Sequence, residues 1–154
     1  SPLAGSEAWK TFDGKIGGAM ERVFELGSAI YSPKVPASQE FFNKYKRTFG
    51  KPIQGGHGIA PSYESVYILA EAIERAGSLD PDAIVAELKK TDRSGVMGRI
   101  RYDDGNQAVY GTDPKENAIG LVFQWTDDGQ RKIVFPASVA EAKIKLPAGL
   151  KSLK

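Results

Sequence analysis

The sequence contains no cysteine and only one histidine among its 154 residues. Without cysteine the chain has no disulfide, no thiolate nucleophile, no zinc ribbon and no iron–sulfur cluster. A single imidazole does not make the cluster that binds zinc or copper. We therefore expect no metal site and no cofactor, and a chemistry that depends on oxygen, amide and aromatic groups.

Strong charge of one sign and long apolar runs are also missing. The 21 Lys and Arg residues nearly balance the 19 Asp and Glu residues, so the formal net charge is +2. No strong positive field is available to hold a phosphate backbone, and we expect no nucleic-acid partner. The apolar stretches are a few residues long, whereas a membrane-spanning helix needs about 20. The composition is typical of one ordinary globular domain or of part of a larger one.

The chain begins at Ser1 and shows no signal-peptide pattern. This predicts a processed protein or a piece cut from something longer. The missing signal therefore leaves the cellular compartment open.

Three helices are predicted in the middle of the chain. Ser38 suits the N-cap of a helix over 39–49, because its hydroxyl can accept a hydrogen bond from an amide of the first turn. A second helix, over 61–76, has apolar residues on more than one stripe and is expected to pack on two sides. Asp80 begins a third helix, over 81–90. Four aromatic residues fall on one side of the first helix, and we interpret them as a core face: Phe41, Phe42, Tyr45 and Phe49.

Strands are predicted on both sides of the helices. The range 98–102 alternates apolar and charged residues, as a strand with one wet face does. The ranges 119–125 and 131–135 form two more strands, joined as a hairpin by an Asp-Gly turn within 126–130. The range 22–26 is a further short candidate.

The most unusual local pattern is Gly55-Gly56-His57-Gly58, just before the second helix. Backbone amides and the positive end of a helix dipole make such a turn an anion or carboxylate site, while the alternative is a flexible connection with an exposed histidine. The pattern matches neither a phosphate loop nor a dinucleotide fingerprint. A hydrolase would need His57 as the base for a serine hydroxyl, but the chain has no Gly-x-Ser-x-Gly elbow, and we assign no catalytic residue.

Four segments in order carry a family resemblance. They are FFNKYK at 41–46 with FGKP at 49–52, SYESVYILAEAI at 62–73 with AG at 76–77, GVMGRIRYD at 95–103, and FQW at 123–125 before DG at 128–129. Together they resemble the C-terminal part of the type I periplasmic solute-binding proteins, the family of the leucine/isoleucine/valine-binding proteins and of relatives that capture amides, urea or aromatic acids. The resemblance covers nearly all of this chain but less than half of a typical member.

The resemblance implies an α/β fold, of the periplasmic binding protein type I class, with incomplete parts of two three-layer lobes joined by crossover strands. It places 1–32 in part of the second lobe and 33–117 in the returning segment of the first lobe. The range 118–154 then forms the hairpin and C-terminal tail of the second lobe. Two crossings are expected, near 31–33 and near 117–120.

The same resemblance implies a ligand site between the lobes. In amino-acid-binding members, a Gly-x-Glu loop of the second lobe receives the ammonium group of the ligand. Gly5-Ser6-Glu7 fits this motif and makes Glu7 the candidate for a cationic group, with Trp9 beside it for ring or aliphatic packing. If Pro2-Leu3-Ala4-Gly5 takes the same place, Glu7 has no such role.

The expected contacts from the first lobe are His57, Gly58 and Ile59, with Tyr63 for packing. A histidine here replaces the usual apolar or aromatic residue and indicates a ligand with a carboxylate, phenol or other polar group. The family's contacts to the ligand carboxylate lie in the N-terminal part that this sequence does not match.

The function implied is capture of a small solute, of the amino acid, amide or aromatic acid class, for delivery to an ABC importer. The implied partners are the small-molecule ligand, the membrane permease of the transporter and the N-terminal part of a parent chain. We expect a periplasmic or extracellular location, with a lipoprotein anchor as an option, and no enzyme activity. The alternatives are a ligand-sensing receptor domain of the same fold and a hydrolase that uses His57. Because a fold cut at Ser1 lacks strands, a partner fragment, self-association or a cleaved but still associated parent chain is also expected.

Overall fold

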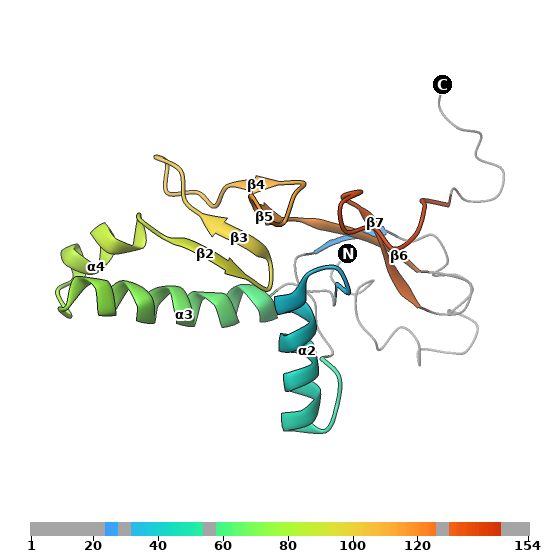
Figure 1. Ribbon diagram of the computed structural model, residues 1–154, viewed down its shortest axis with the longest axis horizontal. Coiled ribbons are helices and arrows are strands. Elements are labelled where there is room, and N and C mark those ends of the chain that lie inside the picture. The colour runs from blue at the N-terminus through green and yellow to red at the C-terminus, as the bar shows by residue number, and fades with distance from the viewer. Residues whose placement is uncertain (1–23, 28–31, 54–57, 126–129, 146–154) are drawn as a thin grey trace.

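The computed structural model describes residues 32–53, 58–125 and 130–145, and the backbone of 24–27. The helices over 59–76 and 81–88 lie toward one end of an elongated molecule, the helix over 36–49 projects from its middle, and a three-stranded sheet lies toward the other end (Figure 1). In chain order the elements are β1 (Phe24–Gly27), α2 (Pro36–Phe49), α3 (Ile59–Ala76), α4 (Pro81–Leu88), β2 (Asp92–Gly95), β3 (Gly98–Arg101), β4 (Tyr110–Gly111), β5 (Ala118–Ile119), β6 (Leu121–Trp125) and β7 (Arg131–Phe135).

The strands form two sheets. One has the order β1-β6-β7 and is antiparallel throughout, which confirms the predicted hairpin of 119–125 and 131–135 for β6 and β7. The other has the order β2-β3-β5-β4, in which only β4 and β5 are parallel. The chain passes from the second sheet to the first between Ile119 and Leu121. This change of sheet falls within the range 117–120, while the division of the chain into lobes stays a prediction.

The start of α2 differs from the prediction. The helix begins at Pro36, whose fixed φ suits the first helical position, after Val35 as N-cap. Ser38 therefore lies inside the first turn, and its predicted role as N-cap was wrong. Its buried hydroxyl instead accepts a hydrogen bond of 2.9 Å from the backbone N–H of Ser32, which fixes the chain that leads into the helix.

The other two helices follow the sequence more closely. Asp80 caps α4 as predicted, because its carboxylate accepts a hydrogen bond of 3.0 Å from the N–H of Ala83. This helix ends at Leu88, two residues before the predicted end. Helix α3 begins at Ile59, two residues before the predicted start, and ends at Ala76 as predicted.

The helix faces are less buried than their apolar patterns predicted. In α2, Phe41 is buried, but the ring of Phe49 at the end of the helix is 59% exposed, so the predicted core face is incomplete. In α3, Val66 and Leu69 are 67% and 46% exposed, and the predicted packing on two sides was wrong for the described residues. The buried positions of α3 follow a single stripe spaced by four residues: Ala60, Glu64, Ile68 and Ala72.

Strand β2 was not predicted, because its sequence DRSG contains no β-branched or aromatic residue. It forms by pairing with β3, and a pair of side chains adds to the backbone bonds. The guanidinium of Arg99 donates hydrogen bonds of 2.6 and 2.7 Å to the two carboxylate oxygens of Asp92. The hydrogen bonds and charge of Arg99 lower the pKa of Asp92.

Among the described residues, three hydrophobic clusters form the core. The first lies under the three-stranded sheet and includes both sides of the change of sheet: Val35, Ile119, Leu121, Phe123, Ile133 and Val139. The second joins α2, α3 and the β2–β3 turn: Phe41, Ile53, Ala60, Val96 and Met97. The third joins α3 to β3 and β5: Ile68, Ile100 and Ala118. The first cluster thus connects the two sheets, while the other two hold the helices on the larger sheet.

Gly98, at the start of β3, gives a test of this arrangement. Its φ is +93°, and a β-carbon there would lie 2.5 Å from the carbonyl oxygen of Asn117. We expect Gly98→Ala to lower the free energy of unfolding by about 2 kcal/mol or more, because strain and overlap add. Urea denaturation followed by circular dichroism measures the change. Gly105→Ala is the matched control, because Gly105 lies in the turn after β3 where only the Asp103 side chain is near, and a cost equal to that of Gly98→Ala would contradict the account.

Candidate functional site

The structure describes three of the predicted ligand contacts. Gly58, Ile59 and Tyr63 lie together at the start of α3. The other predicted contacts lie outside the described residues: Gly5, Ser6, Glu7, Trp9 and His57. Among the residues that the structure describes, no three His, Cys, Asp or Glu side chains come together as metal ligands.

These three residues occupy the first turn and a half of the helix. Gly58 is the N-cap, and its carbonyl accepts a hydrogen bond of 2.9 Å from the N–H of Ser62. Ile59 is half-buried and packs on the cluster between α2 and α3. The ring of Tyr63 packs on Phe41 of α2, with 4.6 Å between the ring centroids. Ile59 and Tyr63 therefore belong to the packing between α2 and α3 as well as to the predicted site.

The hydroxyl of Tyr63 lies 3.4 Å from the hydroxyl of Tyr67, one turn further along α3. That hydrogen bond, together with partial burial, raises the pKa of Tyr63 to about 12. At neutral pH the phenol therefore keeps its proton. Tyr63 can donate or accept a hydrogen bond but cannot serve as a base.

Tyr63 lines a pocket of about 210 Å³ between α2, α3 and β2, which we call the α2–β2 pocket. Its lining residues are Ala37, Glu40, Phe41, Lys44, Tyr63, Glu64, Arg93, Ser94, Gly95 and Val96. Two of the four charged side chains, Glu40 and Lys44, are exposed on α2 and form no ion pair with another described residue. Among the described residues the pocket thus presents one charge of each sign without an ion-pair partner, which suits a zwitterionic or polar ligand.

The other acidic residue of the pocket, Glu64, is buried. One of its carboxylate oxygens accepts a hydrogen bond of 2.8 Å from Nε of Arg93, and the other accepts from the backbone N–H of Val96. Gly95 makes room for this contact, since a β-carbon at that residue would overlap the carboxylate. The carboxylate therefore ties the first half of α3 to the turn between β2 and β3.

Arg93 completes the network. Its guanidinium also pairs with Glu71 and lies 4.8 Å from the centroid of the Tyr67 ring. Burial disfavours its charge, but the hydrogen bond and charge of Glu64 and the charge of Glu71 outweigh burial and raise the pKa of Arg93. The guanidinium is therefore held in one place between two carboxylates and a ring.

A second pocket, of about 310 Å³, borders the segments predicted to cross between lobes. It is lined by Lys34, Val35, Pro36, Ala37, Ser94, Gly95, Gly98, Pro114 and Lys115. The ammonium group of Lys34 donates a hydrogen bond of 2.5 Å to the carbonyl of Ala140, so it is already engaged. The two pockets share Ala37, Ser94 and Gly95, and they therefore form one hollowed region around the start of α2.

The Glu64–Arg93 pair was missed by the sequence analysis. The signal was present, because Glu64 is the one charged residue in the buried stripe of α3, between Ala60 and Ile68. A buried carboxylate requires a partner, but the sequence alone does not show that Arg93, 29 residues away, provides it.

A comparison with known protein families identifies the family of this chain. The model of the periplasmic binding protein family matches residues 2–129, and the chain belongs to that family. This confirms the predicted family and its α/β fold.

The curated relatives extend well beyond the matched region. "Leu/Ile/Val-binding protein homolog 7" of Brucella suis is 25% identical over 123 residues, and its counterpart in Brucella melitensis is 27% identical. In both cases the match covers 77% of this chain and 29% of the relative. The chain thus spans less than a third of the length of these relatives.

Solved structures show the same fold. A protein of Silicibacter pomeroyi assigned to branched-chain amino acid ABC transport has a TM-score of 0.75 at 17% identity, and the match covers 94% of this chain and 38% of that one. A leucine-binding protein of Thermotoga maritima has a TM-score of 0.58 at 29% identity, with coverage of 77% and 32%. An ABC transporter substrate-binding protein of Desulfitobacterium hafniense, solved with Leu, has a TM-score of 0.57 at 22% identity, with coverage of 74% and 31%.

The buried Glu64 carboxylate gives a prediction on stability. Glu64→Ala is expected to lower the free energy of unfolding by about 3 kcal/mol, because the N–H of Val96 and the guanidinium of Arg93 lose their buried partner. Glu74→Ala, on the exposed side of the same helix, is the control and should change stability by about 0.5 kcal/mol or less. Chemical denaturation measures both variants, and similar small losses for the two would refute the proposed role of Glu64.

The raised pKa of Tyr63 gives a prediction on pH dependence. The folded state holds the phenolic proton to about pH 12, whereas an unfolded tyrosine releases it near pH 10. The contribution of Tyr63 to stability is therefore complete below pH 10 and is lost as the pH rises toward 12. Ultraviolet absorbance titration of the folded chain should show one late-ionising tyrosine that disappears in Tyr63→Phe. An unchanged late phase in that variant would contradict the assignment.

Proposed function

We propose that this chain forms part of an extracytoplasmic protein that captures a small solute between two lobes and delivers it to an ABC importer. Membership of the periplasmic binding protein family over residues 2–129 carries the proposal. The names of relatives that bind leucine support the amino acid class. The proposed capture is reversible and involves no covalent step.

The proposed division into lobes follows the chain. The range 1–32 belongs to the second lobe, 33–117 to the first lobe, and 118–154 to the hairpin and tail of the second. Two observations support this division: the chain changes sheet between Ile119 and Leu121, and the buried N–H of Ser32 is fixed by the Ser38 hydroxyl just before α2. Both positions lie at the proposed crossings.

The proposed ligand is an amino acid, an amide or an aromatic acid. The start of α3 supports a carboxylate or another polar group, because the first amides of the helix and its positive dipole end lie beside Gly58, which has no side chain to cap them. Tyr63, protonated at neutral pH, lines the α2–β2 pocket and adds a hydroxyl further along the same helix. Glu7 is proposed to bind the ammonium group from the second lobe, and His57 and Trp9 to contact the rest of the ligand.

The proposed partner is the membrane permease of an ABC importer, and the proposed location is outside the cytoplasmic membrane. The transporter components among the solved relatives support both. Within the described ranges, no helix is both long enough and apolar enough to cross a membrane.

The direct test is calorimetric titration of the full-length product of the gene that encodes this chain, with amino acids, amides and aromatic acids. Saturable binding of one class, with no turnover of amides or esters, is the expected result. Hydrolysis that disappears in His57→Ala would instead establish an enzyme. A full-length product that binds ligand but carries an output domain would establish a sensor.

The proposed role of Glu7 has its own test within that titration. Glu7→Gln should raise the Kd for a ligand with an ammonium group about tenfold or more, because a charge-assisted hydrogen bond is lost. The Kd for ligands without a cationic group should change by about twofold or less. Glu74→Gln on the exposed side of α3 is the control, and an unchanged Kd in Glu7→Gln would remove Glu7 from the site.

A further inference from the structure

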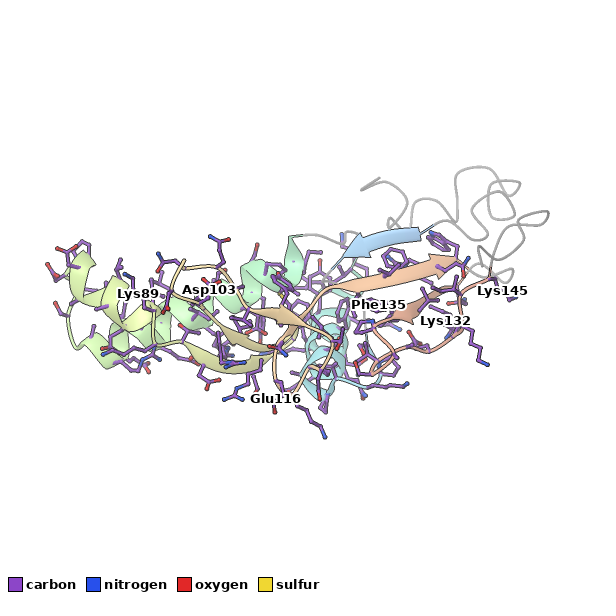
Figure 2. The ribbon with its side chains drawn as sticks, turned by 90° about the horizontal axis from the view of Figure 1, so that it is seen from above. Lys89, Asp103, Glu116, Lys132, Phe135 and Lys145 are labelled. Carbon is purple, nitrogen blue, oxygen red and sulfur yellow. The ribbon has the colours of Figure 1, made fainter. Side chains whose placement is uncertain are left out.

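A third pocket lies away from the proposed crossings. It has a volume of about 310 Å³ and is lined by Val85, Leu88, Lys89, Tyr102 and Asn106. Figure 2 shows Lys89 and Asp103 at one end of the molecule, while Lys132, Phe135 and Lys145 lie at the opposite end. The described lining of this α4 pocket shares no residue with the two pockets around the start of α2.

The walls of the α4 pocket are apolar. Leu88 and Tyr102 are half-buried and pack on the cluster of Ile68, Ile100 and Ala118, so both walls are backed by the core. Val85 is 48% exposed and extends the apolar surface along α4. Such a pocket is hydrophobic over most of its surface, as small-molecule sites are.

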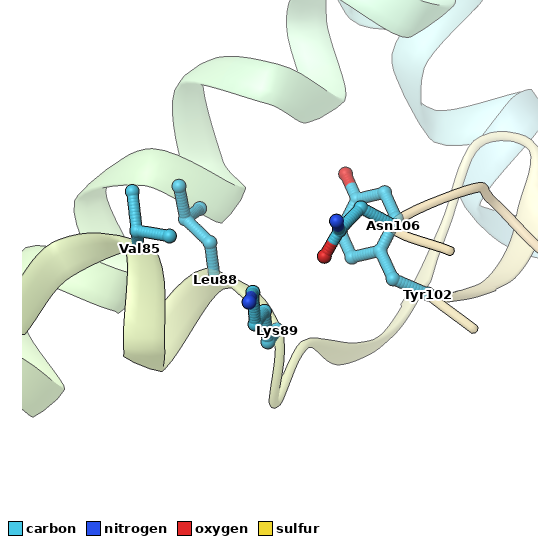
Figure 3. A pocket seen from close by; sticks show the side chains of 5 residues that line it. All are labelled: Val85, Leu88, Lys89, Tyr102 and Asn106. Atoms are coloured by element: carbon cyan, nitrogen blue, oxygen red, sulfur yellow. The ribbon is translucent and has the colours of Figure 1, made fainter. Parts of the chain in front are cut away.

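Three polar groups meet these walls without partners of their own. Figure 3 shows Val85, Leu88 and Lys89 on one side of the pocket and Tyr102 and Asn106 on the opposite side. Within the described part of the chain, the ammonium of Lys89, the amide of Asn106 and the hydroxyl of Tyr102 form no hydrogen bond or ion pair. Together they provide one positive charge and two neutral hydrogen-bonding groups.

The turn after β3 holds Asn106 in place. Its φ is +59°, a region that asparagine tolerates, and its backbone N–H donates a hydrogen bond of 2.9 Å to the carbonyl of Asp103. The carboxylate of Asp103 accepts hydrogen bonds of 2.9 Å from the N–H groups of Gly105 and Gln107. This acidic side chain is therefore occupied within the turn, and none of the described residues that line the pocket is acidic.

We propose that the α4 pocket binds a small organic monoanion with an apolar tail, such as a short-chain monocarboxylate. Lys89 and Asn106 bind the carboxylate, and the tail lies between Val85, Leu88 and the ring of Tyr102. A free amino acid fits less well, because no acidic residue of the pocket receives its ammonium group. A phosphate or dianion fits less well too, because Lys89 is the single cation among the described residues of the lining.

Hexanoate and its neutral analogue hexanamide test the proposal on the 154-residue chain. Because hexanoate is small, a Kd on the order of 1 mM is expected, and hexanamide should bind at least about fivefold more weakly. Two-dimensional ¹H–¹⁵N NMR follows the titration. Saturable shifts at Val85, Leu88, Lys89 and Asn106 support the site. No saturable shift at these residues up to about 20 mM hexanoate would overturn it.

Two variants and a control separate this pocket from unspecific binding. Lys89→Gln should raise the Kd for hexanoate about fivefold or more, through the loss of the charge, and should leave the Kd for hexanamide unchanged. Lys90→Gln makes the same change of net charge at the neighbouring lysine, whose ammonium pairs with Glu87 outside the pocket, and should change the Kd about twofold or less.

Val85→Asp places a carboxylate in the exposed part of the wall and should abolish hexanoate binding while the chain stays folded. Equal effects of Lys89→Gln and Lys90→Gln, or hexanoate binding that survives Val85→Asp, would refute the proposal. The proposed interlobe site is tested separately by Glu7→Gln, so the two proposals fail independently.

Discussion

The packing of α3 against β2 and the β2–β3 turn depends on one buried carboxylate. Glu64 is 1% exposed and lies in the middle of an apolar stripe, where an ionised group without partners would be strongly unfavourable. Its bonds to Arg93 and to the backbone of Val96 remove that cost, and they also fix where the β2–β3 turn lies on α3. The absence of a side chain on Gly95, the position of Arg93 over Tyr67 and the shape of the α2–β2 pocket all follow from this contact.

The elements with local signals were predicted from the sequence. The hairpin of β6 and β7 has alternating apolar residues around an Asp-Gly turn, and the Asp80 cap places its own carboxylate over the next amides. In each case residues close in sequence determine the structure. The family could be predicted too, because four ordered segments together are far more specific than any one of them.

The elements that the sequence analysis missed depend on distant residues. Strand β2 forms because β3 pairs with it, although its own residues favour a turn. The Ser38 side chain does not cap its own helix, because its hydroxyl accepts a hydrogen bond from the N–H of Ser32. The α2–β2 pocket likewise combines Lys44, Tyr63 and Arg93 from three elements, and their proximity follows from packing rather than from spacing along the chain.

The arrangement of the core has a consequence for how the chain opens. The three hydrophobic clusters share no residue, and the β5–β6 passage joins the first to the others through Ile119 and Leu121. Separate clusters joined by only two covalent passages, at the Val35–Pro36 entry to α2 and at β5–β6, favour opening in separate cooperative units rather than all at once. The backbone amides of β6 and β7 therefore exchange with solvent deuterium at rates that depend on the stability of the first cluster. The amides of α3 and β3 exchange at rates that depend on the stability of the other two clusters.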